Sequence, residues 1–266
     1  MIRDDNMVNS EKFIISPDHI KKMANYDGLN NDDFQVPSNV ILTFNKGVVD
    51  ELKKICNLEE WEWKAAKYNQ YYRSPKKSWR GKVGSKEIFV VVPPMGASPI
   101  AAFSEDLIYF GAERIFLLCA SWSLGSNYLD KGQIHLPSFA MGVDGTSIHY
   151  MNENGHVKAQ RTTLNEFRKV LNMQGADWKM GGVGSCEAFY RICEKMLGYY
   201  RKKGCLSVEN GEVAALYSIA REYDFPIGVL LQPYIDLEKG IDKSYMGEEY
   251  NNTCKMQARV AVEVIR

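Results

Sequence analysis

Two glutamates stand three positions apart at a place where chemistry could occur. Glu209 and Glu212 frame the run Glu-Asn-Gly-Glu, directly after a strand-like segment and at the start of a helix-like one. Acidic side chains in the first turn of a helix can simply complement its dipole. A carboxylate can also accept hydrogen bonds from the two neighbouring hydroxyl groups of a ribose in a bidentate arrangement. The spacing alone leaves both interpretations open.

A second candidate is the loop Pro94–Pro99, which places Gly96 and Ser98 at the start of a helix. Backbone N–H groups at such a position can hold an anion or an oxygen of a ligand. The loop matches neither the G-x-G-x-x-G fingerprint nor the P-loop. A ligand loop and a plain strand-to-helix turn are therefore both open.

The residue types that commonly bind metals are scattered along the chain. The four histidines are each isolated, and the six cysteines contain no C-x-x-C pair, so no spacing predicts a metal site. Because the N-terminus lacks an apolar export signal, we interpret the cysteines as reduced thiols of a cytoplasmic protein. These residues are His19, His135, His149, His156, Cys56, Cys119, Cys186, Cys193, Cys205 and Cys254.

The loop Pro94–Pro99, called the glycine loop below, lies inside a predicted strand–helix–strand unit. Ile88–Val92 is an apolar, β-branched run typical of a buried strand, and Ile100–Phe110 is the helix that follows the loop. Gly111 ends that helix, and Arg114–Ala120 is the next strand. This order predicts two parallel strands joined by a helix.

Further elements extend this unit on both sides. Val40–Phe44 reads as a strand, and Val48–Ile55 reads as a helix because its apolar residues recur three to four positions apart. Glu212–Tyr223 is a helix, Ile227–Gln232 is a strand, and Tyr250–Ile265 is the last helix. The pattern predicts an α/β sheet flanked by helices.

In such sheets, ligands bind beyond the carboxyl ends of the strands. We therefore expect the functional site among five segments that follow predicted strands. They are Thr43–Gly47, Pro94–Pro99, Ser121–Ser126, Leu231–Ile235 and Val208–Glu212.

Composition narrows the classes of partner. In the 266-residue chain, 33 Lys and Arg balance 33 Asp and Glu, so the net charge is zero. This balance argues against nucleic acid and anionic membranes as partners. No apolar run approaches the ~18 residues of a membrane span.

The basic stretch Arg73–Lys86 is expected to be a surface loop or hairpin. We predict one domain over residues 38–266, preceded by an N-terminal extension over residues 1–37.

Four segments are informative as an ordered set. They are Phe89–Leu124, which contains the Met-Gly loop, Ala140–Tyr150 (AMGVDGTSIHY), Gly182–Tyr190 (GVGSCEAFY) and Ser207–Ala220 (SVENGEVAALYSIA). Together they resemble the nucleoside phosphorylase family, which includes uridine phosphorylase and the hexameric purine nucleoside phosphorylases. The last segment is similar to that family's Glu-Met-Glu helix start.

The resemblance implies a mixed, partly barrelled central sheet flanked by helices, and a homo-oligomer, either a dimer or a trimer of dimers. It also implies cleavage of the N-glycosidic bond of a purine or pyrimidine nucleoside by phosphate, without a metal or an organic cofactor. Gly96 and Ser98 would supply ligand contacts.

The resemblance also assigns roles to individual residues. Glu212 matches the family's second glutamate, which would bind the ribose and take part in catalysis. Either Glu209 or Asn210 would take the role of the first glutamate. Phe189 would pack against the base or the sugar. Gln232, from its place after the last predicted strand, would contact and distinguish the base.

The chain departs from the family's pattern where phosphate should bind. Val49 and Leu117 stand at positions of phosphate-binding arginines, and Ala120 stands at the position of a hydroxyl. Pro233 stands where the purine enzymes have an acidic residue, and Lys46 is the only cation in these segments. A phosphate dianion needs charge-assisted hydrogen bonds, so phosphate is a doubtful partner.

Three hypotheses follow from these residues. The first is a divergent phosphorylase that binds phosphate with other cations. The second is a nucleosidase that uses water as the nucleophile. The third is a non-catalytic, nucleoside-binding or structural oligomer.

Overall fold

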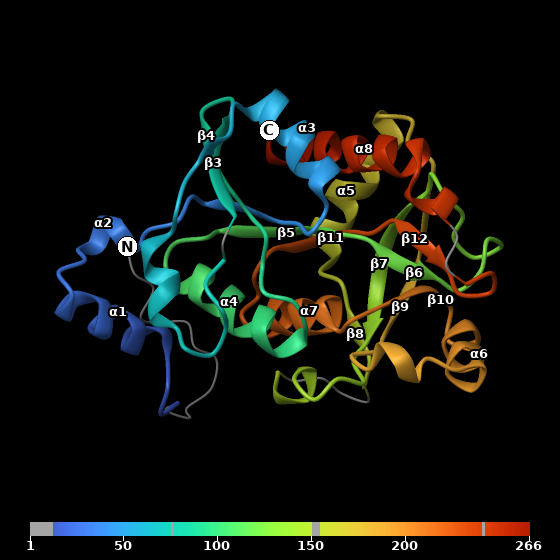
Figure 1. Ribbon diagram of the computed structural model, residues 1–266, viewed down its shortest axis with the longest axis horizontal. Helices are drawn as coiled ribbons and strands as arrows, with labels where there is room; N and C mark the ends of the chain where they lie inside the picture. Colours follow the sequence, from blue (N-terminus) through green and yellow to red (C-terminus); the bar gives the residue numbers. More distant parts are fainter. Residues whose placement is uncertain (1–12, 76, 151–154, 241–242) are drawn as a thin grey trace.

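The computed structural model describes residues 13–75, 77–150, 155–240 and 243–266. Residues 1–12 of the predicted extension lie outside this part. The rest of the extension contains two short helices, α1 (Pro17–Tyr26) and α2 (Asn31–Phe34). They lie at one end of the molecule (Figure 1) and pack beside the 3₁₀ helix η1 (Lys64–Tyr68). Trp63 Nε1 donates a hydrogen bond of 2.8 Å to Phe34 O there.

Four parallel strands form the buried part of the first sheet. Its members are β1 (Asn39–Leu42), β2 (Glu59–Glu60), β3 (Ser78–Val83), β4 (Lys86–Val91), β5 (Arg114–Leu118) and β11 (Ile227–Leu230). The strand order is β11-β5-β1-β4-β3-β2, and the first four strands are parallel. Strands β3 and β4 form an antiparallel hairpin. Its first strand and its turn fall in the basic stretch Arg73–Lys86, for which the sequence predicts a surface loop or hairpin, whereas β4 runs on from Lys86 and is buried from Ile88 to Val91.

A second sheet of six strands holds the other half of the molecule. Its members are β6 (Ser121–Ser123), β7 (Ile134–Met141), β8 (Val157–Lys158), β9 (Trp178–Ser185), β10 (Cys205–Glu209) and β12 (Pro233–Asp236). The strand order is β12-β6-β10-β9-β7-β8, with both parallel and antiparallel pairs.

Sequence periodicity does not single out β9, because glycines interrupt its apolar pattern. These glycines serve packing between elements. A Cβ atom at Gly184 would lie 2.7 Å from the ring of the buried Tyr200. Such a close approach is a property of the tertiary structure and has no local signature.

The two sheets are continuous with each other along two strands. β5 passes through Cys119 and Ala120 into β6, and β11 passes through Leu231 into β12. Leu231 N donates a hydrogen bond of 2.8 Å to His135 O, and His135 N donates one of 2.8 Å to Leu231 O. The mixed α/β fold predicted from the sequence is confirmed, with its strands divided between two joined sheets.

Helices cover both faces of the sheets (Figure 1). On one face, α4 (Ala97–Tyr109) packs against α7 (Glu212–Glu222) in the largest apolar core. On the opposite face lie α3 (Lys46–Cys56), α5 (Arg161–Met173) and α8 (Glu248–Ile265). The predicted helices over residues 48–55, 100–110, 212–223 and 250–265 all correspond to these elements.

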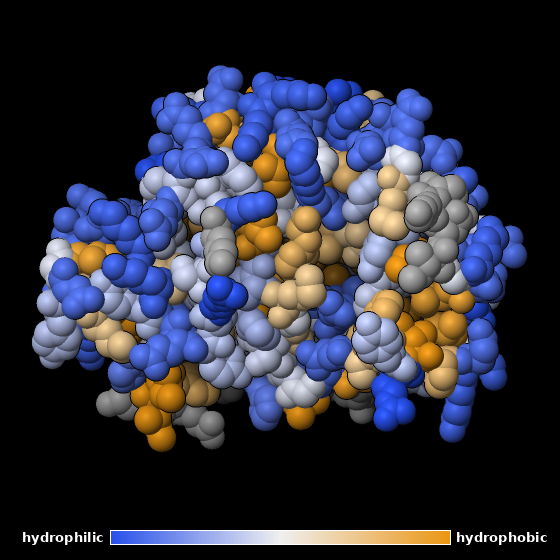
Figure 2. Space-filling view, viewed as in Figure 1, coloured by the Kyte–Doolittle hydropathy of each residue, from blue (hydrophilic) through white to orange (hydrophobic). Residues whose placement is uncertain are grey.

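The remaining elements of the described chain are smaller and include α6 (Glu194–Lys202) and the 3₁₀ helices η2 (Ser147–His149) and η4 (Phe189–Arg191). The short η5 (Lys243–Met246) precedes α8. Within the described residues, no helix has the length and apolar character needed to cross a membrane. Hydrophilic side chains dominate the face shown in Figure 2, and apolar ones gather in a hollow near its centre.

Candidate functional site

All five segments expected at the carboxyl ends of the strands contribute to one cavity of about 240 Å³. The strand topology explains this convergence, since the parallel strands of both sheets deliver their following loops to the same place. The residues that line the cavity are Phe44, Asn45, Met95, Leu117, Cys119, Ala120, Ser121, Trp122, Glu209, Asn210, Glu212, Val213, Leu231, Tyr234 and Tyr250.

Glu212 is held at the cavity by the glycine loop. It is buried, and its Oε1 accepts a hydrogen bond of 2.9 Å from Gly96 N. Gly96 has a φ of 100°, a conformation that side chains other than glycine rarely adopt. The backbone N–H of the loop therefore orients a carboxylate of the chain itself.

Gly211 brings the two glutamates close to the glycine loop. Its φ is 101°, and a Cβ atom there would lie 3.1 Å from the Cβ of Ala97. A larger residue would push α7 away from α4. The run Glu-Asn-Gly-Glu thus needs its glycine to seat both carboxyl groups at the cavity wall.

Glu209 is a buried carboxyl group beside Glu212. Its Oε1 accepts a hydrogen bond of 3.0 Å from Ser185 Oγ, and its Oε2 accepts one of 3.2 Å from Val213 N. Burial raises the pKa of Glu209 well above its ordinary value, and the neighbouring Glu212 raises it further. Glu209 therefore keeps a proton at a pH where an exposed glutamate would be charged.

Asn45 and Ser121 bring unsatisfied polar atoms to the cavity. Asn45 Oδ1 accepts a hydrogen bond of 2.9 Å from Tyr250 Oη, while Asn45 Nδ2 has no partner in the described structure. Ser121 Oγ is also buried without a partner there. Buried polar atoms in folded proteins usually have a partner, so these two are the atoms that a water or a ligand would satisfy.

Neither Asn45 nor Ser121 was singled out in the sequence, although both lie in the predicted ligand segments. Asparagine and serine are common in loops, so their types carry no signal by themselves. Their position after a strand end was the available clue.

The described residues that line the cavity include no Lys or Arg. Leu117 and Ala120, for which the resemblance implies phosphate-binding positions, line the cavity. Val49 is buried in the core between α3 and α8. Lys46 lies outside the cavity on the exposed side of α3, where its Nζ is 2.6 Å from Asp50 Oδ2.

Three other predicted residues lie near the cavity without lining it. Ser98 Oγ forms a hydrogen bond of 2.7 Å with Tyr71 Oη. Gln232 is buried behind the wall, where its Nε2 donates a hydrogen bond of 2.9 Å to Cys254 Sγ. Phe189 is 39% exposed, and its ring centroid lies 4.9 Å from that of Trp122, which does line the cavity.

Trp122 and Tyr234 give the cavity an aromatic wall that sequence reasoning missed. Trp122 Nε1 donates a hydrogen bond to Tyr234 Oη. Burial raises the pKa of the Tyr234 hydroxyl, while the hydrogen bond from Trp122 acts in the opposite direction. Both residues lie within the predicted segments at residues 121–126 and 231–235.

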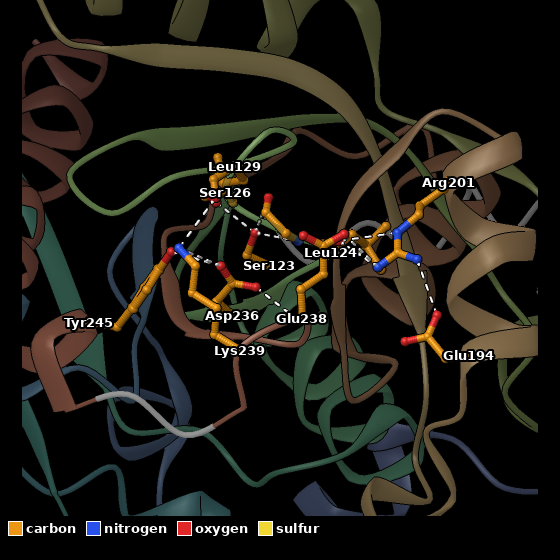
Figure 3. A network of polar contacts seen from close by, with 11 residues as sticks. Ser123, Leu124, Ser126, Leu129, Glu194, Arg201, Asp236, Glu238, Lys239 and Tyr245 are labelled. Atoms are coloured by element: carbon orange, nitrogen blue, oxygen red, sulfur yellow. Dashed lines mark hydrogen bonds and ion pairs between the residues drawn. The ribbon is translucent and has the colours of Figure 1, made fainter.

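A polar network fixes the strands that carry this aromatic wall (Figure 3). Arg201 donates hydrogen bonds of 3.2 and 2.9 Å to Leu124 O just beyond β6, and its Nη2 lies 3.1 Å from Glu238 Oε1. On the other side of the network, Asp236 accepts hydrogen bonds from Tyr245 Oη at 3.2 Å and from Glu238 N at 2.9 Å. Asp236 is fully buried in this network and does not line the cavity.

Groups of three or more His, Cys, Asp or Glu side chains arranged to hold a metal ion are absent from the described residues. The chemistry that the cavity offers comes from its two carboxyl groups, its neutral donors and its aromatic rings.

The sequence matches the model of the phosphorylase superfamily over residues 39–265. Among characterised proteins, it is 29% identical over 150 residues to the purine nucleoside phosphorylase DeoD-type 1 of Shewanella oneidensis. That alignment covers 54% of this chain and 61% of the relative, so the chain spans less than two thirds of that protein's length.

Two solved structures are similar across most of the chain. The purine nucleoside phosphorylase of Toxoplasma gondii, in complex with immucillin-H, superposes with a TM-score of 0.70 at 19% identity, covering 96% of each chain. The uridine phosphorylase of Vibrio fischeri superposes with a TM-score of 0.70 at 21% identity, covering 87% of this chain and 93% of the other. At these identities the likeness shows the fold.

Proposed function

Because the chain belongs to the phosphorylase superfamily, we propose that it cleaves the N-glycosidic bond of a nucleoside, with water as the nucleophile. The single observation that carries the choice of water is the absence of Lys and Arg from the described residues that line the cavity. A buried phosphate dianion would lack a counter-charge there, which costs several kcal/mol. Water needs no such charge.

In this proposal the two glutamates bind the sugar. Glu212, oriented by Gly96 N at 2.9 Å, accepts hydrogen bonds from the ribose hydroxyl groups. Glu209 and Asn210 line the same part of the cavity and assist. Phe189 and Trp122, whose rings contact each other at an interplanar angle of 56°, pack against the base.

The unpartnered atoms Asn45 Nδ2 and Ser121 Oγ support a site for the attacking water. Two neutral donors can hold a water oxygen while its protons remain free to leave. The neighbouring glutamate pair then serves as the base, because burial and the neighbouring Glu212 raise the pKa of Glu209, and a carboxylate with a raised pKa accepts a proton more readily. The water oxygen bonds to C1′ as the C1′–N bond breaks, and the water proton passes to the pair. The nitrogen of the base keeps the electron pair of the broken bond and takes up a proton from solvent, so the products are ribose and the neutral base.

The proposal is tested by measuring base release from uridine, inosine and adenosine with and without phosphate. We expect release in phosphate-free buffer, free ribose as the second product, and less than about a twofold change when phosphate is added. Formation of ribose 1-phosphate with an absolute need for phosphate would instead establish phosphorolysis. A lack of release from a full panel of nucleosides would rule out both reactions.

The variant Ser121→Ala tests the water site. Removing one donor of a positioned nucleophile should lower kcat about tenfold and leave KM within about twofold, since Ser121 does not bind the sugar in this proposal. Steady-state kinetics in phosphate-free buffer separate the two constants. An unchanged kcat would remove Ser121 from the mechanism.

A further inference from the structure

Among the described residues that line the cavity, every Asp, Glu, Lys or Arg side chain is acidic. Glu209 and Glu212 line it, and their described hydrogen-bond donors, Gly96 N, Ser185 Oγ and Val213 N, are neutral. No ion pair joins either glutamate to a cation within the described residues.

Two further carboxylates, Asp144 and Glu187, lie beside Glu212. A Cβ atom at Gly211 would lie 3.4 Å from Asp144 Cβ and 3.4 Å from Glu187 Cγ, which places both side chains against the loop that carries the glutamate pair. Burial raises the pKa of Glu187, with Asp144 and Glu212 adding to the effect. A negative potential at a cavity attracts ligands of positive charge and disfavours anions.

The aromatic wall has the chemistry that stabilises an organic cation. Trp122 and Tyr234 line the cavity, and Phe189 packs against Trp122 in a tilted arrangement with ring centroids 4.9 Å apart. The indole N–H of Trp122 is already engaged by Tyr234 Oη, so the indole offers a ligand its π surface. Aromatic faces attract cations, and tryptophan does so most strongly.

The carboxyl groups among the described lining residues, Glu209 and Glu212, are assigned to the sugar and the attacking water in this proposal, which leaves no carboxylic acid there for a departing neutral base. Pro233 stands at the position where the resemblance implies an acidic residue, and Asp236 is committed to Tyr245 and Glu238. Burial raises the pKa of Cys119 and of Tyr234, so neither gives up a proton readily. A neutral purine or pyrimidine leaves poorly unless it is protonated or strongly hydrogen-bonded.

We propose that the nucleoside bound here carries a positively charged base, as in the riboside of a pyridinium or of an N-alkylated purinium. This inference rests on the N-glycosidic cleavage proposed above and names its substrate class. A base that is already cationic is attracted by the negative potential and by the aromatic wall, and it leaves as a neutral molecule without protonation by an acid.

The reaction balances without any other reactant. The water oxygen bonds to C1′ while the bond from C1′ to the cationic ring nitrogen breaks. The electron pair of that bond neutralises the nitrogen, and the base leaves as a neutral heterocycle. The water proton passes to the glutamate pair and then to solvent. The products are ribose, the neutral base and one proton.

A matched pair of ligands isolates the effect of the charge. The riboside of 3-carbamoylpyridinium and its 1,4-dihydro form share sugar and ring substituents, but only the first is a cation. Binding is measured by calorimetry on the full chain with the carbocyclic analogue of each, which resists cleavage because a CH₂ group replaces the ribose ring oxygen. We expect the cation to bind at least about tenfold more tightly.

Variants locate the origin of the preference. Glu212→Gln retains an acceptor for Gly96 N but removes the charge, and Trp122→Leu removes the aromatic surface. Each should reduce the cation preference by about threefold or more. Trp178→Leu is the matched control, because Trp178 lies at the start of β9, outside the cavity lining, and should keep the full preference.

Cleavage assays distinguish failure of this inference from failure of the proposed function. Equal binding of cation and neutral analogue, with base release from neutral nucleosides, would overturn the inference and leave the hydrolytic function standing. A clear cation preference with no base release from any riboside would support the cationic ligand and refute the catalytic function. Binding of neither analogue would overturn the inference, and if no riboside released its base either, both proposals would be overturned.

Discussion

Glu212 is the cavity residue whose carboxylate is held by the loop Pro94–Pro99. Its Oε1 accepts the hydrogen bond of Gly96 N, so the position of α4 sets the position of the carboxylate. Glu209 is fixed from the other side by Ser185 Oγ and Val213 N. The two carboxyl groups are thereby held in place before a ligand arrives, which is the arrangement that catalysis by positioning requires.

The prediction at this scale concerns the charge of Glu212. The variant Glu212→Gln should lower base release by about 100-fold, because the sugar loses its charged acceptor and the attacking water loses a base. Initial rates are measured on the nucleoside that the wild-type protein cleaves fastest. Glu222→Gln, at the far end of the same helix α7, is the matched control and should stay within twofold. Equal rates for Glu212→Gln and the control would contradict a catalytic role.

At the scale of elements, glycines allow helices and strands to approach closely. Gly228 lies in β11, and a Cβ atom there would lie 2.1 Å from the ring of Phe167 and 3.0 Å from the ring of Phe116. Both rings are fully buried, so neither can move aside easily. The glycine lets α5 lie against the sheet on the strand that continues to Leu231 at the cavity.

We therefore predict that Gly228→Ala lowers the free energy of unfolding by roughly 2–3 kcal/mol, because the methyl group overpacks this contact. Urea denaturation measures the change. Gly198→Ala is the matched control: Gly198 lies within α6 with nothing inside 4 Å of an added Cβ, so alanine should raise the free energy of unfolding by about 0.5–1 kcal/mol. Equal stabilities for both variants would show that the contact at Gly228 relaxes at no cost.

At the scale of the whole molecule, the junction of the two sheets contains a buried histidine. His135 pairs with Leu231 across the junction, and its Nδ1 forms a hydrogen bond of 3.0 Å with Ser207 Oγ. Burial lowers the pKa of His135 to about 4, so the ring is neutral in the folded protein. The unfolded chain binds a proton there below pH ~6.5 and the folded protein does not.

It follows that the free energy of unfolding should rise as pH increases from about 4 to about 6.5, by about 3 kcal/mol for this group alone. Urea denaturation of the wild-type protein and of His135→Gln over this range measures the difference. Burial raises the pKa of Asp106 to about 6, so this group lowers the free energy of unfolding as pH rises over the same range. Because Asp106 is present in both proteins, its contribution cancels in the difference between wild type and variant. Parallel curves for both proteins would contradict a neutral, buried His135.

The second prediction at this scale concerns assembly. Apolar side chains are exposed close to the cavity, among them Met95 at 62% and Tyr190 at 95%. Such exposure is typical of surfaces that another chain covers. We expect a homo-oligomer, a dimer or a trimer of dimers, with a mass in light scattering of at least twice the 30.3 kDa of the chain. A monomer at micromolar concentration would contradict this expectation.

The sequence by itself determined the elements and the segments that could hold a site. Apolar runs and helical periodicity are local properties, so they located α3, α4, α7, α8 and the buried strands of the first sheet. The rule that ligands bind beyond the carboxyl ends of strands then selected the five segments that meet at the cavity.

Only the tertiary structure decided which side chains face one another. Asn45, Ser121, Trp122 and Tyr234 line the cavity, whereas Gln232, one residue beyond Leu231, is buried behind its wall. Gln232 and Tyr234 would share a side of a regular strand, but the register of β12 against β6 shifts between Pro233 and Ile235, and such an irregularity re-aims side chains. That register, and the meeting of residues as distant in the chain as Asn45 and Tyr250, which are 205 positions apart, are set by packing between elements, which no local pattern in the chain encodes.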